Sequence, residues 1–268
     1  LVPAHLAPKA TSALLLGGIL SAFIGPELAV KGKYLFKTEY SGSFLLLTLS
    51  YMLGMLIVSF YQETGVAETR HQSDGRPLLH IMRTPWVILA VAAAGLGYGI
   101  MSFIMTATPI SMHLHAGHSL ESTKLVIQSH IAAMYLPSLV YAWFFGKLGF
   151  KGMLWAGTVI YLLCIVVALI NTDFIHFWLA LVMVGIGWNF LFLSGTNLLP
   201  YGYQHNERFR VQSANDFLVF SIQAIASLSS GWVLYHWGWE GVLWACVPLA
   251  LAFALLLALV KLPRITRD

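Results

Sequence analysis

The sequence predicts an all-α membrane protein, and composition is the first reason. Hydrophobic residues make up 58% of the 268 residues and charged residues only 10%, whereas about a quarter of the residues in a soluble domain are charged. The mean hydropathy of +0.76 agrees with this composition. No ten-residue stretch alternates between apolar and polar residues, as the strands of a membrane barrel do. We therefore expect helices to cross the membrane.

Long apolar runs are the second reason, since a helix needs about 20 apolar residues to cross a hydrocarbon core of roughly 30 Å. Eight segments meet this length: 10–30, 42–61, 85–107, 121–146, 152–170, 174–199, 212–236 and 240–261. The longest polar connection, 63–83, divides them into two groups. We expect two helices in 1–62, a central loop at 63–83 and six helices in 84–268.

Lysine and arginine are spread unevenly over the loops between these segments. If alternate loops share a side, one side has eleven of these residues and the other has only Lys31, Lys33, Lys37 and Lys124. Loops rich in basic residues face the cytoplasm, so we expect the loop 63–83 and the C-terminus on that side. In a membrane protein the positions of the basic residues matter more than the net charge of +4, and we expect no nucleic-acid partner.

Stripes of polar and aromatic residues run along several of the expected spans. In 212–236, five polar residues are spaced to share one helical face: Gln212, Asp216, Gln223, Ser227 and Ser230. Polar groups in hydrocarbon usually face a bundle interior or a water-filled path. The candidates for lining such a path are Tyr98, Ser102, Met105, Gln128, His130, Tyr135, Trp188, Asn189, Thr196, Asn197 and Gln223. The alternative is that they only form hydrogen bonds between helices.

Charged and titratable residues near the ends of spans are candidates for gating or coupling. Asp216 follows Arg208 and Arg210, which predicts an ion pair or a helix N-terminal charge that helps to close an inner gate. His130 lies well inside a span, and its imidazole is a candidate for proton coupling because histidine titrates near neutral pH. A buried imidazole with a purely structural hydrogen bond is the alternative.

Glycine and proline in the first span predict close helix packing and a bend in the helix. Gly25 lets helices approach closely, and Pro26 removes a backbone hydrogen bond. Glu27 and Lys31 are four residues apart on the same helix, a spacing that favours an ion pair.

The stretch SMHLHAGHSL contains three histidines, His113, His115 and His118, at a spacing that suits a metal ion. Metal sites usually draw ligands from several segments, and Glu121 is the nearest acidic residue. We therefore interpret the histidines as a titratable outer rim and expect neither a metal nor a cofactor. Cys164 and Cys246 lie in apolar runs and are expected to act as small apolar residues.

Several motifs resemble those of a major facilitator superfamily permease. GGILSAFIGPEL is similar to the glycine-rich fifth helix of that family, and FFGKLGFKGML resembles a degenerate form of its short cytoplasmic loop motif, without the acidic residue and the first arginine. The stretches GYGIMSFIMTATPISMHLHAGHS, GIGWNFLFLSGTNLLPYGY and NERFRVQSANDFLVFSIQAIASLSSG resemble a bacterial subgroup that includes riboflavin-type permeases.

This resemblance implies the last eight of twelve helices, with one complete six-helix half and two helices of the other. It implies secondary transport of a small organic solute by alternating access in the bacterial inner membrane, with riboflavin-like solutes and protons as candidates. It also implies a truncated chain that does not transport alone and a full-length protein that is a monomer. A membrane metal or redox enzyme, and a receptor or assembly subunit without transport, are the alternatives.

Overall fold

The computed structural model describes residues 7–61 and 75–262, and it is helical with no strand in those ranges. The all-α prediction is confirmed for this part of the chain. The helices are, in chain order, α1 (Ala7–Lys33), α2 (Ser41–Ser59), α3 (Leu78–Met82), α4 (Pro85–Ile110), α5 (Leu120–Tyr135), α6 (Tyr141–Ile170), α7 (Phe174–Leu198) and α8 (Arg208–Leu259). Short π and 3-10 turns occupy Ser111–His115, Leu136–Leu139, Leu199–Gly202 and His205–Glu207.

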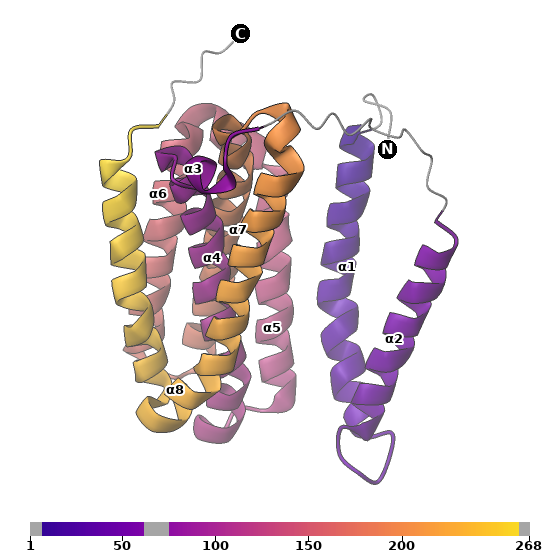
Figure 1. The fold of residues 1–268 in the computed structure, drawn as a ribbon. Helices are drawn as coiled ribbons and strands as arrows, with labels where there is room; N and C mark the ends of the chain where they lie inside the picture. Colours follow the sequence, from indigo (N-terminus) through magenta and orange to yellow (C-terminus); the bar gives the residue numbers. More distant parts are fainter. Residues whose placement is uncertain (1–6, 62–74, 263–268) are drawn as a thin grey trace.

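Two long helices reverse direction at a glycine. Gly149 in α6 has φ 63° and ψ −175°, and Gly238 in α8 has φ 67° and ψ −172°. This backbone region is accessible almost only to glycine. Figure 1 shows the result for α8: its orange arm runs down the bundle and its yellow arm runs back up. The spans expected at 212–236 and 240–261 are thus the two arms of one hairpin.

Five helices of the described part are long and apolar enough to cross a membrane, and the stretch His205–Leu259, with its reversal at Gly238, is one of them. The expected total of eight spans stays a prediction. The expected loop 63–83 falls partly outside the described residues, and its described end contains the short helix α3.

A glycine-to-alanine change at the α8 reversal tests this geometry. We expect Gly238→Ala to destabilise the protein by about 1–3 kcal/mol because alanine is strained at this φ and ψ. The matched control is Gly231→Ala on the same helix, where an added Cβ would meet no atom within 4 Å and should stabilise the helix by about 1 kcal/mol. Thermal unfolding in detergent measures both changes, and equal effects of the two substitutions would contradict the turn.

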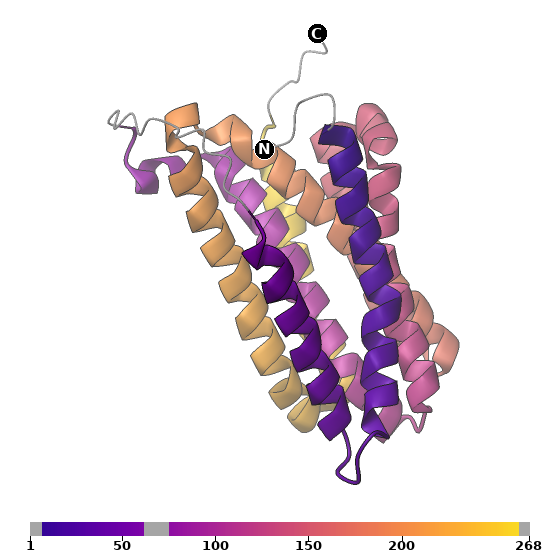
Figure 2. The same ribbon diagram turned by 90° about the vertical axis from the view of Figure 1, so that its right-hand side faces the viewer.

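The helices form a bundle of α4 to α8 with an α1–α2 hairpin beside it (Figure 1). Within the bundle α4 packs against α7 and α8, and α7 also packs against α5 and α6. The turned view in Figure 2 shows α1 and α2 running along the bundle as two separate rods. The hairpin joins the bundle through α1 and α5, whereas α2 is almost wholly exposed.

Glycines set the distance between the central helices. A Cβ added at Gly185 of α7 would lie 2.6 Å from the backbone oxygen of His130 in α5, and one at Gly195 would lie 2.6 Å from the oxygen of Ala90 in α4. No side chain fits at either place. Both α5 and α4 are therefore held directly against the backbone of α7.

In the described structure the close helix contact that we expected at Gly25 lies at Gly32 instead. Among the described residues, a Cβ at Gly25 would meet no atom within 4 Å, whereas one at Gly32 would lie 2.6 Å from backbone atoms of Ser43 in α2. The close crossing of α1 and α2 is at Gly32 because the chain turns back shortly after it. Pro26 lies inside α1, which continues as one helix to Lys33.

Candidate functional site

An aromatic cluster lies where four helices of the bundle meet. Tyr98 of α4 contacts Trp188 and Phe192 of α7 and Phe220 of α8, with ring centroids 5.2, 5.1 and 5.7 Å apart. Tyr135 of α5 contacts Trp188 at 6.5 Å. Tyr98 and Trp188 lie near the middle of α4 and α7, and Phe220 lies near the middle of the first arm of α8, whereas Tyr135 is the last residue of α5.

Trp188 is the centre of this aromatic cluster. Phe192 stacks on it with centroids 5.0 Å apart and the rings 12° from parallel, while Tyr98 and Tyr135 present their rings to it at steep angles. The indole is 5% exposed, and its buried Nε1 has no hydrogen-bond partner among the described residues. A buried donor without an acceptor is costly, so the cluster has one unmet hydrogen-bonding group.

Sequence reasoning identified Tyr98, Tyr135 and Trp188, and the structure brings these three together. It missed Phe192 and Phe220, which complete the cluster. The available signal was spacing, since Phe192 is four residues after Trp188 and Phe220 is three before Gln223. Phenylalanine is also common on lipid-facing surfaces, so spacing alone does not single these residues out.

Polar side chains next to the cluster hold α5, α6 and α7 together. Asn189 donates from Nδ2 to the backbone oxygen of Met134, at 2.7 Å, and to Ser138. The hydroxyls of Tyr141 and Ser194 are 2.9 Å apart. These contacts fix α7 against its neighbours directly after Trp188, at Asn189 and Ser194.

Two expected path residues point elsewhere. Gln128 is buried against α1, where its Nε2 donates to the backbone oxygen of Phe23 at 3.1 Å. His130 is fully buried against α7, with Nδ1 2.8 Å from the oxygen of Leu181. Its Nε2 has no partner among the described residues. The structure therefore puts both side chains at helix–helix contacts.

The remaining expected path residues lie on α4, α7 and α8 without a shared contact. Ser102 is buried, with its hydroxyl 4.0 Å from the sulfur of Met101, and Met105 is partly buried against the core. Thr196 is exposed, and Asn197 lies beside the Tyr141 hydroxyl. Gln223 is half-buried on the first arm of α8.

The expected gate residues are spread along the start of α8. That helix begins at Arg208, so Asp216 lies beyond its first turn, and its Oδ1 accepts from Asn215 at 3.0 Å. Arg208 lies 5.8 Å from the ring of Phe209. Arg210 donates to the backbone oxygen of Arg76. Of these residues, only Arg210 contacts the end of the central loop.

An ion pair that sequence reasoning missed joins the central loop to the connection before α8. Glu207 is 1% exposed and accepts from Arg76 through Nε at 3.0 Å, Nη2 at 2.7 Å and the backbone nitrogen at 2.9 Å. The pKa of the Arg76 guanidinium is raised above its ordinary value because Glu207 accepts its hydrogen bonds. The bidentate geometry is the strong form of this interaction.

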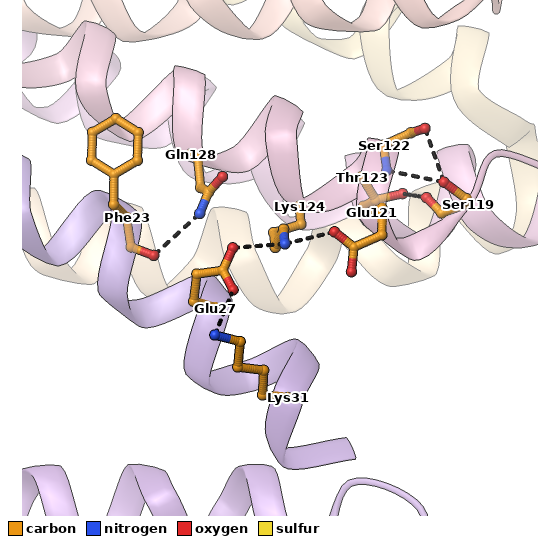
Figure 3. Close-up of polar contacts among 9 residues, drawn as sticks. All are labelled: Phe23, Glu27, Lys31, Ser119, Glu121, Ser122, Thr123, Lys124 and Gln128. Atoms are coloured by element: carbon orange, nitrogen blue, oxygen red, sulfur yellow. Dashed lines mark hydrogen bonds and ion pairs between the residues drawn. The ribbon is translucent and has the colours of Figure 1, made fainter. Parts of the chain in front are cut away.

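At the opposite end of the bundle, charged residues connect α1 with α5 (Figure 3). Lys124 of α5 lies 2.7 Å from Oε1 of Glu27 in α1 and 2.6 Å from Oε2 of Glu121. Glu27 also lies 3.5 Å from Lys31, which confirms the ion pair expected from their spacing. We call these four residues the α1–α5 charge network.

The three histidines of the outer rim do not converge. His113 contacts the backbone oxygen of His118 at 2.9 Å, and the ring of His118 contacts the oxygen of Thr172 at 2.8 Å. His115 is exposed at the end of the π turn. The described residues contain no group of three potential ligands around a common point.

Comparison with curated proteins finds relatives along most of the chain. It is 34% identical over 262 residues, 97% of its length, to the riboflavin transporter RfnT of Brucella anthropi. It is also 29% and 30% identical to YddS and YdeG of Bacillus subtilis, two uncharacterized MFS-type transporters, over 85% and 80% of its length. The chain is a homologue of major facilitator superfamily transporters. This confirms the family resemblance seen in the sequence.

The homology to this superfamily, together with the apolar helices, shows a multi-pass membrane protein. The matches cover 64%, 56% and 53% of the three relatives, so the chain spans less than two thirds of each. No family model matches the chain, and no solved structure matches it.

Proposed function

We propose that this chain lines the path of a small organic solute in a secondary transporter that works by alternating access. The observation that carries this proposal is the aromatic cluster around Trp188, because four helices of the bundle contribute to it and Tyr98, Trp188 and Phe220 come from the middle of their apolar spans. Substrate sites of such transporters lie near the bilayer midplane. In this proposal the α1–α2 hairpin belongs to one rigid body and the bundle of α4 to α8 forms the other, and the two bodies tilt against each other during transport.

A planar heteroaromatic solute with a hydrogen-bond acceptor at its edge suits this cluster. Aromatic rings bind such solutes through offset or edge contacts, and the Nε1 of Trp188 is a donor without a partner among the described residues. Riboflavin has this chemistry, and the relative from Brucella anthropi is named for it. Riboflavin-like solutes are therefore the substrate class that we propose.

The proposed setting is the bacterial inner membrane, with both ends of α8 in the cytoplasm: its start at Arg208 and its C-terminal end, which Lys261 follows. Protons are the proposed coupling ion, with His130 as the candidate residue. Its burial between α5 and α7 would tie its protonation to the packing of these helices.

Uptake of labelled riboflavin tests the proposal directly. The gene product that contains this chain is expressed in bacteria that cannot take up riboflavin. We expect saturable uptake above a vector control and a loss of accumulation when a protonophore removes the proton gradient. Verified membrane expression without uptake would reject the riboflavin-like class, and uptake unaffected by the protonophore would reject proton coupling.

A further inference from the structure

The contact between α1 and α5 is the main junction between the α1–α2 hairpin and the bundle. Its two helices run antiparallel, and their contacts keep one register. Glu27 meets Lys124, the backbone of Phe23 meets Gln128, and an added Cβ at Gly18 would lie 2.9 Å from the ring of Tyr135. The contact therefore extends from the charge network to the aromatic cluster.

The two ends of this contact differ in chemistry. Near Gly18 an aromatic ring lies directly over helix backbone, whereas near Glu27 the helices are joined by an ion pair and a hydrogen bond. Beside the ion pair a groove of roughly 520 Å³ lies between the helices, and Pro26, Thr123 and Lys124 help to line it. The charged end thus borders open space.

Each member of the ion pair between the helices has a second partner on its own helix. Lys124 lies 2.6 Å from Glu121, three residues earlier on α5. Glu27 lies 3.5 Å from Lys31, four residues later on α1. If α1 and α5 separated at this end, both charges would keep an opposite charge. Removing one partner of an ion pair normally leaves the other uncompensated, which is the main cost of breaking it. That cost is small here.

We propose that Glu27 and Lys124 form a reversible latch that holds this end of the α1–α5 contact closed, and that Lys31 and Glu121 receive the two charges when the latch opens. This inference rests on the proposed function, because alternating access requires one end of the path to close while the other opens. The side chain of Lys124 is 13% exposed and that of Glu27 is 37% exposed, so water reaches the carboxylate and the pair exchanges partners without crossing hydrocarbon.

The latch predicts opposite effects for the two kinds of partner. Neutralising Glu27 or Lys124 removes the bond between the helices and favours the open form. Neutralising Lys31 or Glu121 leaves that bond in place but removes a charge that the open form needs, so it favours the closed form. An ion pair with a merely structural role would not divide the four residues in this way.

The experiment uses the full-length gene product in lipid nanodiscs, where reagents reach both faces. Thr123→Cys places a thiol in the groove next to the latch, at a position that is 6% exposed, and the native Cys164 and Cys246 are buried. The rate of labelling by a hydrophilic maleimide, above that of the same protein without Thr123→Cys, then reports opening without any need for transport.

We expect Glu27→Gln and Lys124→Gln each to speed labelling up to about fivefold, the upper end of the range for an exposed ion pair. Lys31→Gln and Glu121→Gln are the matched controls and should label no faster than the parent. Equal rates in all five proteins, or a shift of all four variants in the same direction, would overturn the latch. Labelling as expected without riboflavin uptake would reject the proposed substrate and leave the latch standing.

Discussion

Replacing Trp188 with alanine should lower the affinity for riboflavin at least about tenfold, which corresponds to about 1.4 kcal/mol. Trp188 contacts Tyr98, Tyr135 and Phe192, so its loss removes the ring that orients the other three. Equilibrium binding of riboflavin to the full-length protein measures the change. Trp188→Phe keeps a ring but removes the Nε1 donor, and its affinity should fall between those of the parent and the alanine variant.

Trp244→Ala is the control for this experiment. Trp244 is 59% exposed on the second arm of α8, and we expect its removal to leave the affinity unchanged. Thermal unfolding of each variant separates a loss of binding from a loss of fold, because a large cavity at Trp188 costs roughly 3–5 kcal/mol of stability. A folded Trp188→Ala protein with the parent's affinity would remove Trp188 from the site.

Replacing Glu207 with glutamine should lower the melting temperature by roughly 5 °C or more, since losing one partner of a buried ion pair is strongly destabilising. Both carboxylate oxygens of Glu207 accept hydrogen bonds, from Arg76 and from the backbone nitrogen of Gln204. An amide keeps the shape but turns one acceptor into a donor that faces the guanidinium. Differential scanning fluorimetry of the detergent-solubilised protein measures the shift.

Glu240→Gln makes the same chemical change at an exposed position of α8 and should alter stability by less than about 0.5 kcal/mol. A melting temperature for Glu207→Gln within 1 °C of that of Glu240→Gln, roughly the shift that corresponds to 0.5 kcal/mol, would show that the Arg76–Glu207 pair contributes little.

Composition and apolar run length were enough to predict the helical class, because the hydrocarbon core dictates both. Composition and run length could not predict that the spans 212–236 and 240–261 join at a single glycine. Nothing in the sequence around Gly238 distinguishes it from the glycines inside the spans. The same limit applies to Gly25, which was expected to pack closely. Whether a glycine contacts a neighbour depends on the rotation of the helix about its axis, and that rotation is set by the partner helix.

Only part of the candidate site could be predicted, because the sequence shows which residues are polar or aromatic but not which helix they contact. Tyr98, Tyr135 and Trp188 carry both a ring and a polar group, so they stand out in an apolar span. His130 and Gln128 stand out equally, yet each bonds to the backbone of a neighbouring helix. The Arg76–Glu207 pair joins residues 131 positions apart, and nothing local in either segment indicates the partner of the other.

The glycine reversals in α6 and α8 have a mechanical consequence. A single residue makes each turn, so the two arms have no slack between them, and a tilt of one arm is transmitted to the other. Gly149 and Gly238 have almost the same backbone angles, so the two turns connect their arms with the same geometry. A displacement of the first arm of α8 at Phe220, its residue in the aromatic cluster, would be passed to the C-terminal arm through Gly238 alone.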